Sequence, residues 1–178
     1  FNQNLLDNFN YDNVVIKNCN ITNFYYGVKV LSADGTQIIE GNDLRLNDFY
    51  GIYLYQTENT LIDSNSLIND NNGVYMIGAG NTTITNNTIN LQKKFYGIYG
   101  FNSNINIIAN NTLWDNYHGI YLVNSSYTNA SNNNITSSDV YSLFVHKSTS
   151  NSYFTNNNLS TGLEAVRIKS SSNNNQFI

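Results

Sequence analysis

Gly97-Ile98-Tyr99-Gly100 opens a stretch that closes on Asn110-Asn111-Thr112-Leu113, and both motifs recur along the chain. The first motif, Gly-(Ile/Val)-x-apolar and its degenerate copies, begins at positions 22 to 24 residues apart: Gly27, Gly51, Gly73, Gly97, Gly119, Ser142 and Ala165. The second motif keeps the same phase, and its second residue falls on Cys19, Asn42, Asn65, Asn87, Asn111, Asn133 and Asn157. A fixed period of this length indicates a solenoid of stacked coils.

Both motifs alternate apolar and polar residues over short runs, a pattern that predicts strands rather than helices. Three short strands in each coil of about 23 residues bury an apolar face only when coils stack at about 4.8 Å. The sequence contains no proline, as expected if strand interiors donate amide hydrogens to neighbouring coils. We therefore predict an all-β fold, a right-handed single-stranded parallel β-helix of about seven coils. We expect the repeated glycine to supply a backbone conformation that a tight corner requires.

The repeat predicts one β-helix domain over residues 1–178. Residues 1–13 read as an irregular first coil, 14–170 as regular coils and 171–178 as the start of a further coil. An open coil exposes unpaired amides and core side chains, so we expect further chain, another chain or a neighbouring subunit to cover the ends.

Asparagine is unusually abundant, with 37 residues, whereas charged residues make up only 11% of the chain. Identical amides on successive coils can hydrogen-bond along the helix axis, so the Asn column of the second motif predicts an asparagine ladder. Cys19 occupies the same column and is expected to be a small buried thiol.

With these repeats the chain resembles the parallel β-helix repeat proteins. That group includes NosD-like periplasmic proteins, a carbohydrate-binding and sugar-hydrolase group, and archaeal adhesin-like surface proteins. The resemblance rests on the Asn-Asn-Thr-Ile and Gly-Ile-Tyr-Leu units over roughly residues 14 to 170. It implies the fold, while the functions of such repeats range over lyases, tailspikes, adhesins and envelope proteins.

The centre of the first motif forms an outward-facing column that is mostly aromatic. Its candidate binding residues are Tyr53, Tyr75, Tyr99, Tyr121 and Phe144. Such an exposed stripe could stack on sugar rings or pack against a partner, or the rings could simply stack on one another. Two further aromatic columns precede the glycine, and we expect half of these side chains to fill a corner of the core.

For an enzyme we would expect paired acids on adjacent coils. The weak catalytic candidates are Asp48 and Asp70, which the repeat places in one column with Lys94 on the next coil. Two stacked acids could also hold calcium, but a solvated polar face is the favoured explanation. The two histidines, His118 and His146, are far apart in sequence, so neither copper nor zinc is predicted and no cofactor is expected.

The net charge of −4 and the lack of a basic cluster disfavour a nucleic-acid partner. No apolar run is long enough for a membrane span. Eight glycosylation sequons occur, of which Asn81, Asn124 and Asn129 fall in expected turns and are the accessible candidates. Asn86 and Asn110 lie beside the ladder and are expected to be less accessible.

The sequence therefore predicts a non-catalytic extracellular or cell-surface module, such as part of an envelope layer (S-layer), an adhesin or a filament. Its expected partners are other copies of itself or other surface proteins. Glycans are a further candidate class of partner. The alternative is a carbohydrate-active β-helix enzyme of the polysaccharide lyase or hydrolase type.

Overall fold

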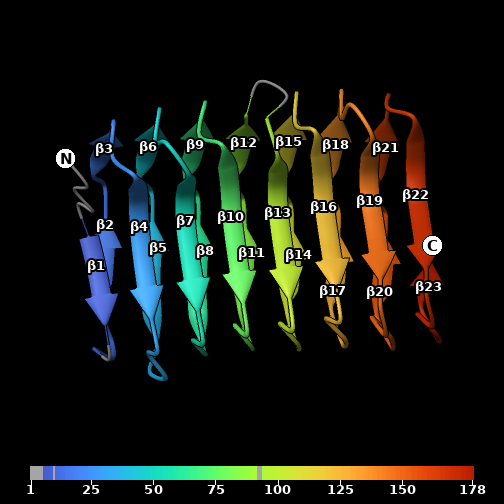
Figure 1. Cartoon of the computed structure of the whole chain (residues 1–178), viewed down its shortest axis with the longest axis horizontal. Coiled ribbons are helices and arrows are strands. Elements are labelled where there is room, and N and C mark those ends of the chain that lie inside the picture. The colour runs from blue at the N-terminus through green and yellow to red at the C-terminus, as the bar shows by residue number, and fades with distance from the viewer. Residues whose placement is uncertain (1–5, 10, 92–93) are drawn as a thin grey trace.

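The computed structural model describes residues 6–9, 11–91 and 94–178, which form a parallel β-helix of three sheets (Figure 1). The strands of the first sheet run side by side along the near side in Figure 1, with β1 at one end of the solenoid and β22 at the other. In Figure 1 the near strands point downward, and the chain returns upward behind them as it advances from left to right. This makes the coil right-handed, as is usual for parallel crossovers. The prediction of the fold class is confirmed.

Each coil contributes one strand to each sheet. Sheet A contains β1 (Leu6–Phe9), β4 (Tyr26–Leu31), β7 (Tyr50–Tyr55), β10 (Asn72–Ile77), β13 (Tyr96–Phe101), β16 (His118–Val123), β19 (Tyr141–His146) and β22 (Glu164–Lys169). Sheet B contains β2 (Val15–Lys17), β5 (Gln37–Glu40), β8 (Thr60–Asp63), β11 (Thr83–Thr85), β14 (Ile107–Ala109), β17 (Asn129–Ser131), β20 (Tyr153–Thr155) and β23 (Gln176–Phe177). Sheet C contains β3 (Asn20–Thr22), β6 (Asp43–Arg45), β9 (Ser66–Ile68), β12 (Thr88–Asn90), β15 (Thr112–Trp114), β18 (Asn134–Thr136) and β21 (Asn158–Ser160).

Residues 22 to 24 positions apart lie directly over one another. Val74 of β10 pairs with Ile52 on one side and Ile98 on the other, and all three are the Ile/Val residue of the first motif. These side chains are fully buried and join inward residues of sheets B and C in one continuous core. The strands are short because each coil turns a corner after three to six residues, so core packing depends on stacking rather than on any single coil.

The first chain segment is more regular than its sequence suggested. Leu6–Phe9, expected to belong to an irregular first coil, form β1, which pairs in register with β4. Residues 1–5 and 10 of that expected coil lie outside the described residues. Within the described part of the chain, no helix is long and apolar enough to cross a membrane.

The asparagine ladder is present at the corner between sheets B and C. Asn111 Oδ1 accepts hydrogen bonds from both the backbone N (2.9 Å) and Nδ2 (3.0 Å) of Asn87, and Asn87 Nδ2 also donates to Ile62 O (2.9 Å). The residue before each ladder position adopts a left-handed conformation, with φ of 57° at Asn110. Asparagine tolerates that conformation, which explains why the motif contains two asparagines in succession. Cys19 takes the first ladder position and is partly buried, not fully buried as expected.

The repeated glycine has a different role from the one expected. Among these glycines no positive φ occurs, so the corner does not demand an unusual backbone conformation. Instead, a Cβ on Gly27 would lie 2.6 Å from the carbonyl oxygen of Gly51 on the next coil. The motif therefore favours glycine because successive coils approach closely at this position, and the two degenerate copies carry only the small residues Ser142 and Ala165.

Candidate functional site

Two columns of rings cover the outer surface of sheet A and together form what we call the aromatic face. One column contains Tyr26, Tyr50, Tyr96, His118 and Tyr141, and the other contains Tyr53, Tyr75, Tyr99, Tyr121 and Phe144. Strand alternation directs the second column away from the core, because Ile52 and Leu54 on either side of Tyr53 are buried. The first column lies three residues earlier, before the buried glycine, and its rings contact those of the second column, as Tyr50 does Tyr53 at 5.0 Å. The columns cross six strands, β4 to β19, which corresponds to a length of about 24 Å.

The rings of the aromatic face pack against one another, some stacked and some tilted or edge-on. Tyr75 lies 4.4 Å from Tyr99 and 4.8 Å from Tyr50 between ring centroids, and Tyr121 lies 4.4 Å from Phe144. The predicted exposed stripe is therefore half-buried, because each ring covers its neighbours. Phe144 is only 5% exposed, so the expectation that its ring is exposed is wrong, and its role in binding stays a prediction. The surface offers ring edges and partial faces rather than separate exposed rings.

The aromatic residues before the repeated glycine also lie outside the core. None of the aromatic residues in the two positions before the glycine belongs to the buried core cluster. The core at that corner is filled by aliphatic residues such as Leu44 and Leu67. The expectation that half of these aromatics fill a core corner is therefore wrong. Phe49 is 41% exposed and stacks on Tyr25 at 3.9 Å, and Phe95 is 52% exposed. These side chains widen the aromatic face toward the corner between sheets C and A.

The aromatic face is uncharged over most of its length. Desolvation by burial raises the pKa of the Tyr121 phenol to about 12, and burial also raises the pKa values of Tyr75 and Tyr99. Burial lowers the pKa of His118 to about 4, so its imidazole is neutral at physiological pH. Its ring is stacked against Tyr141 at 5.0 Å. The phenols therefore remain hydrogen-bond donors, and none of these groups contributes charge near neutral pH.

Cations lie at the two ends of the aromatic face. Lys29 Nζ lies 5.5 Å from the ring centroid of Tyr26 near the N-terminal end. Arg167 lies 5.3 Å from the ring centroid of Tyr141 at the other end, and its Nη1 donates to the Tyr141 hydroxyl (2.9 Å). Cation–π contacts of this kind favour a fixed ring orientation at each end of the stack.

A second ladder lies at the corner between sheets C and A, and the sequence motifs did not reveal it. Its members, Asn47, Asp70, Asn116 and Ser138, are all buried, but only Asn47 and Asp70 are linked by hydrogen bonds. The side-chain oxygens of Asn116 and Ser138 have no partner among the described residues. Asp70 Oδ1 accepts from the backbone N (2.8 Å) and Nδ2 (2.9 Å) of Asn47, as an amide oxygen does in the first ladder. The ladder was missed because its residue types vary from coil to coil, so no repeated letter marks the column.

This second ladder corrects the proposed acid pair. Asp70 stacks on Asn47, not on Asp48. The reason is that the corner before β7 contains one residue more than the corner before β10, which the repeat did not indicate. Asp48 is the next residue along the chain and is exposed, whereas Asp70 is 0% exposed. The two carboxyl groups therefore do not form the stacked pair that acid–base catalysis by adjacent coils would use.

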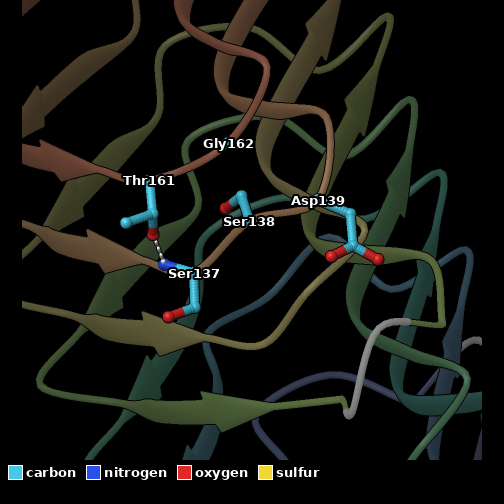
Figure 2. A pocket seen from close by; sticks show the side chains of 5 residues that line it. All are labelled: Ser137, Ser138, Asp139, Thr161 and Gly162. Carbon is cyan, nitrogen blue, oxygen red and sulfur yellow. Dashed lines mark hydrogen bonds between the residues drawn. The ribbon is translucent and has the colours of Figure 1, made fainter.

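A cleft of about 360 Å³ lies at the same corner near the C-terminal end (Figure 2). Thr161 Oγ1 accepts a hydrogen bond from the Ser137 backbone N (2.5 Å), and the Asp139 carboxylate lies apart from that pair in Figure 2. Ser138 also lines the cleft, and its hydroxyl is buried. The cleft contains one carboxylate and hydroxyl groups without a neighbouring base, an arrangement that does not form a nucleophile–base pair.

The three candidate glycosylation residues are exposed. Asn81 and Asn124 adopt left-handed turn conformations, and Asn129 lies on β17 with its side chain exposed. Asn86 and Asn110 are exposed as well, so the expectation that the ladder would shield them is wrong. Their side chains leave the corner because the ladder begins one residue later. Attachment of a glycan at any of these sequons stays a prediction.

The fold and the outer surface define a parallel β-helix protein with a stacked aromatic sheet. The model of the family described as periplasmic copper-binding protein (NosD) matches residues 2–177, and the chain belongs to this family. Searches of curated proteins and of solved structures found no match.

The described residues do not fit the copper site that the family description suggests. Copper in proteins is bound by imidazole, thiolate and thioether groups. His118 is enclosed by rings, Met76 is fully buried in the core, and Cys19 lies at a corner near the N-terminal end. In the part of the chain that the structure describes, no three His, Cys, Asp or Glu side chains converge as a metal site requires.

Proposed function

We propose that this protein is an exported, non-catalytic module of the envelope or cell surface that contacts glycans or other proteins through its aromatic face. The observation that carries the proposal is the extended, uncharged set of packed rings outside the core. The core is already complete without these rings, so their stacking on the outer surface is not needed to fill it. Contiguous exposed aromatic surface is typical of interaction sites.

The family description supports the location. Members are described as periplasmic, which places the family outside the cytoplasm, and we extend that location to this chain. The envelope-layer, adhesin and filament roles are particular forms of the same proposal. Contacts between copies of the chain would use the same surface, because aromatic rings are enriched in protein interfaces.

The placement of the acids favours binding over turnover. Asp70 is sealed inside the second ladder, and Asp48 stands on the surface without a second carboxyl stacked on it. We therefore include no catalytic step in the proposed function, and we propose that binding needs no cofactor.

The proposal is tested by binding of the purified protein to a glycan array and to isolated envelope material. The variant Tyr75→Gln with Tyr99→Gln removes two central rings, and we expect at least tenfold weaker binding, which corresponds to about 1.4 kcal/mol. Tyr153→Gln is the matched control, because Tyr153 is 50% exposed on sheet B, away from the aromatic face.

Two results would contradict the proposal. Equal binding by the double variant and the wild type would exclude the aromatic face as the contact surface, provided that circular dichroism shows both proteins folded. Release of reducing sugar by the wild type, lost in Asp48→Asn, would exclude a non-catalytic role. The double variant Tyr75→Phe with Tyr99→Phe keeps the rings and separates ring contacts from hydroxyl contacts.

A further inference from the structure

The aromatic rows of sheet A are interrupted on one coil. At the start of β10, Asn71 and Asn72 occupy the places that aromatic residues hold on both neighbouring coils. The backbone N of Asn72 donates to Phe49 O (3.0 Å), and the backbone N of Phe95 donates to Asn71 O (3.1 Å). These bonds place Asn71 on the coil between Phe49 and Phe95.

Asn71 is the one short side chain between Phe49 and Phe95 in this row, and from the coil spacing we infer a notch the width of one ring, which adjoins the cleft described below. Phe49 and Phe95 lie two coils apart, which is about 9.6 Å at the usual strand spacing. A guest ring midway between them would lie about 4.8 Å from each wall, within the range of stacked rings. Phe49 is held in place by its contact with Tyr25, and both phenylalanines are substantially exposed. The notch is therefore bounded by accessible aromatic walls, with a short amide side chain at its base.

Polar groups surround the notch on the side of the corner between sheets C and A. A cleft of about 310 Å³ lies there, and its lining includes Asp48, Asn69, Asn71 and Lys94. Asp48 directly precedes Phe49, and Lys94 directly precedes Phe95, so one acid and one base stand next to the two walls. Their charges are opposite, which gives the cleft no net preference for an anion or a cation.

Two of these groups are fixed by hydrogen bonds within the protein. Lys94 Nζ donates to Asn69 O (3.1 Å), and Asn71 Nδ2 donates to Asp48 O. Asn69 Oδ1 is buried at the cleft and has no hydrogen-bond partner among the described residues.

We propose that this notch binds one sugar ring of a neutral glycan, with the apolar faces of the ring between Phe49 and Phe95 and its hydroxyls at Asp48, Asn69, Asn71 and Lys94. The proposal rests on the glycan contacts of the proposed function and specifies their place. A sugar matches the site because it carries apolar C–H faces and several hydroxyl groups. An aromatic side chain of a protein partner would fill the walls but would leave most of these polar groups unused.

The test measures binding of neutral cello-, xylo- and manno-oligosaccharides to the full chain by isothermal titration. Asn71→Phe fills the notch with the aromatic residue type of the neighbouring coils, so the fold should tolerate it, and we expect binding to be lost. Phe95→Ala removes one wall, and we expect at least tenfold weaker binding. Tyr117→Ala is the control, because Tyr117 continues the same row beyond the notch and is 43% exposed.

The proposal is overturned if Asn71→Phe binds an oligosaccharide as tightly as the wild type does. It is also overturned if no oligosaccharide of the panel binds the wild type, or if N-acetyltyrosinamide binds at the notch and the sugars do not. The proposed function is still supported after these results if binding of a protein partner or a glycan is weakened by the Tyr75 and Tyr99 substitutions. Failure of the proposed function is distinguished by binding that ignores the Tyr75 and Tyr99 substitutions altogether.

Discussion

Replacing Asp70 by asparagine should stabilise the protein near neutral pH and have little effect in acid. Asp70 Oδ1 receives two hydrogen bonds from Asn47, but Oδ2 is buried and has no hydrogen-bond partner. In Asn47 the equivalent atom is Nδ2, which donates to Ile21 O (3.4 Å). Strand pairing of Ile21 with Leu44 puts the carbonyl of Leu44 in the corresponding position for Asp70. An ionised Oδ2 would therefore face an acceptor, whereas a protonated one could donate.

The magnitude follows from the pKa of this carboxyl group. Burial raises the pKa of Asp70 from 3.8 to about 7, opposed by the hydrogen bonds from Asn47 and by the positive charge of Lys94, and Asp43 adds to the increase. Between these two values the folded protein binds a proton that the unfolded chain has released, so the free energy of unfolding falls as the pH rises. A difference of about 3 in pKa corresponds to a loss of about 4 kcal/mol, complete above pH 7.

Asparagine keeps the oxygen and adds an amide donor, and it does not titrate. Urea unfolding at pH 4 and pH 8 should therefore show Asp70→Asn close to the wild type at pH 4 and about 4 kcal/mol more stable at pH 8. Asp48→Asn is the control, because it makes the same chemical change on an exposed side chain one residue from the Asn47 ladder position. A stability difference for Asp70→Asn that is the same at both pH values would refute the assignment of a buried, protonated carboxyl group.

Three further outcomes are expected. Asn111→Ala removes the acceptor of two Asn87 donors inside the first ladder, and urea unfolding should show a free energy of unfolding lower by about 3 kcal/mol. A decrease below about 0.5 kcal/mol would contradict a stabilising role for these two hydrogen bonds. Phe144→Ala should lower the free energy of unfolding by about 3 kcal/mol, since the ring is buried, whereas Tyr153→Ala should change it little; equal effects would contradict the stacked face. Titration with Cu(II) should give no saturable one-to-one isotherm, with or without prior EDTA treatment, and tight binding abolished by His118→Ala would show that the ring stack opens to the metal.

The fold was predictable from the sequence because the coil period decides it, and the same residue types recur at that period. Asn87, Asn111 and Val74 recur in phase with their equivalents, and each occupies the column that the period assigns. The second ladder was not predictable in this way, since Asn47, Asp70 and the later members differ in residue type. Small changes in corner length then misplace a column by one residue, which is how Asp48 was wrongly stacked on Asp70.

The exposed fraction of the aromatic face could not be predicted from the alternation of residues either. Alternation correctly directs Tyr99 and Phe144 away from the core, but it does not say that rings on successive coils cover one another. At about 4.8 Å between coils, an aromatic ring is large enough to contact both neighbours, so outward does not mean exposed. The end of the stack shows the same effect, because Phe144 is buried by Tyr121 and Tyr141.

These observations separate what fixes the coil register from what varies on the surface. The first ladder and the inward columns set the register at each coil, since Asn111 and Ile98 are held by both neighbours. Coil lengths of 22 to 24 residues are absorbed at corners, so an outer column stays aligned while corner residues change. A single coil can therefore replace aromatic residues by Asn71 and Asn72 without disturbing the strands on either side. In a solenoid built this way, a ring-sized recess in an otherwise continuous aromatic surface arises from substitutions on one coil alone, and its width is set by the coil spacing.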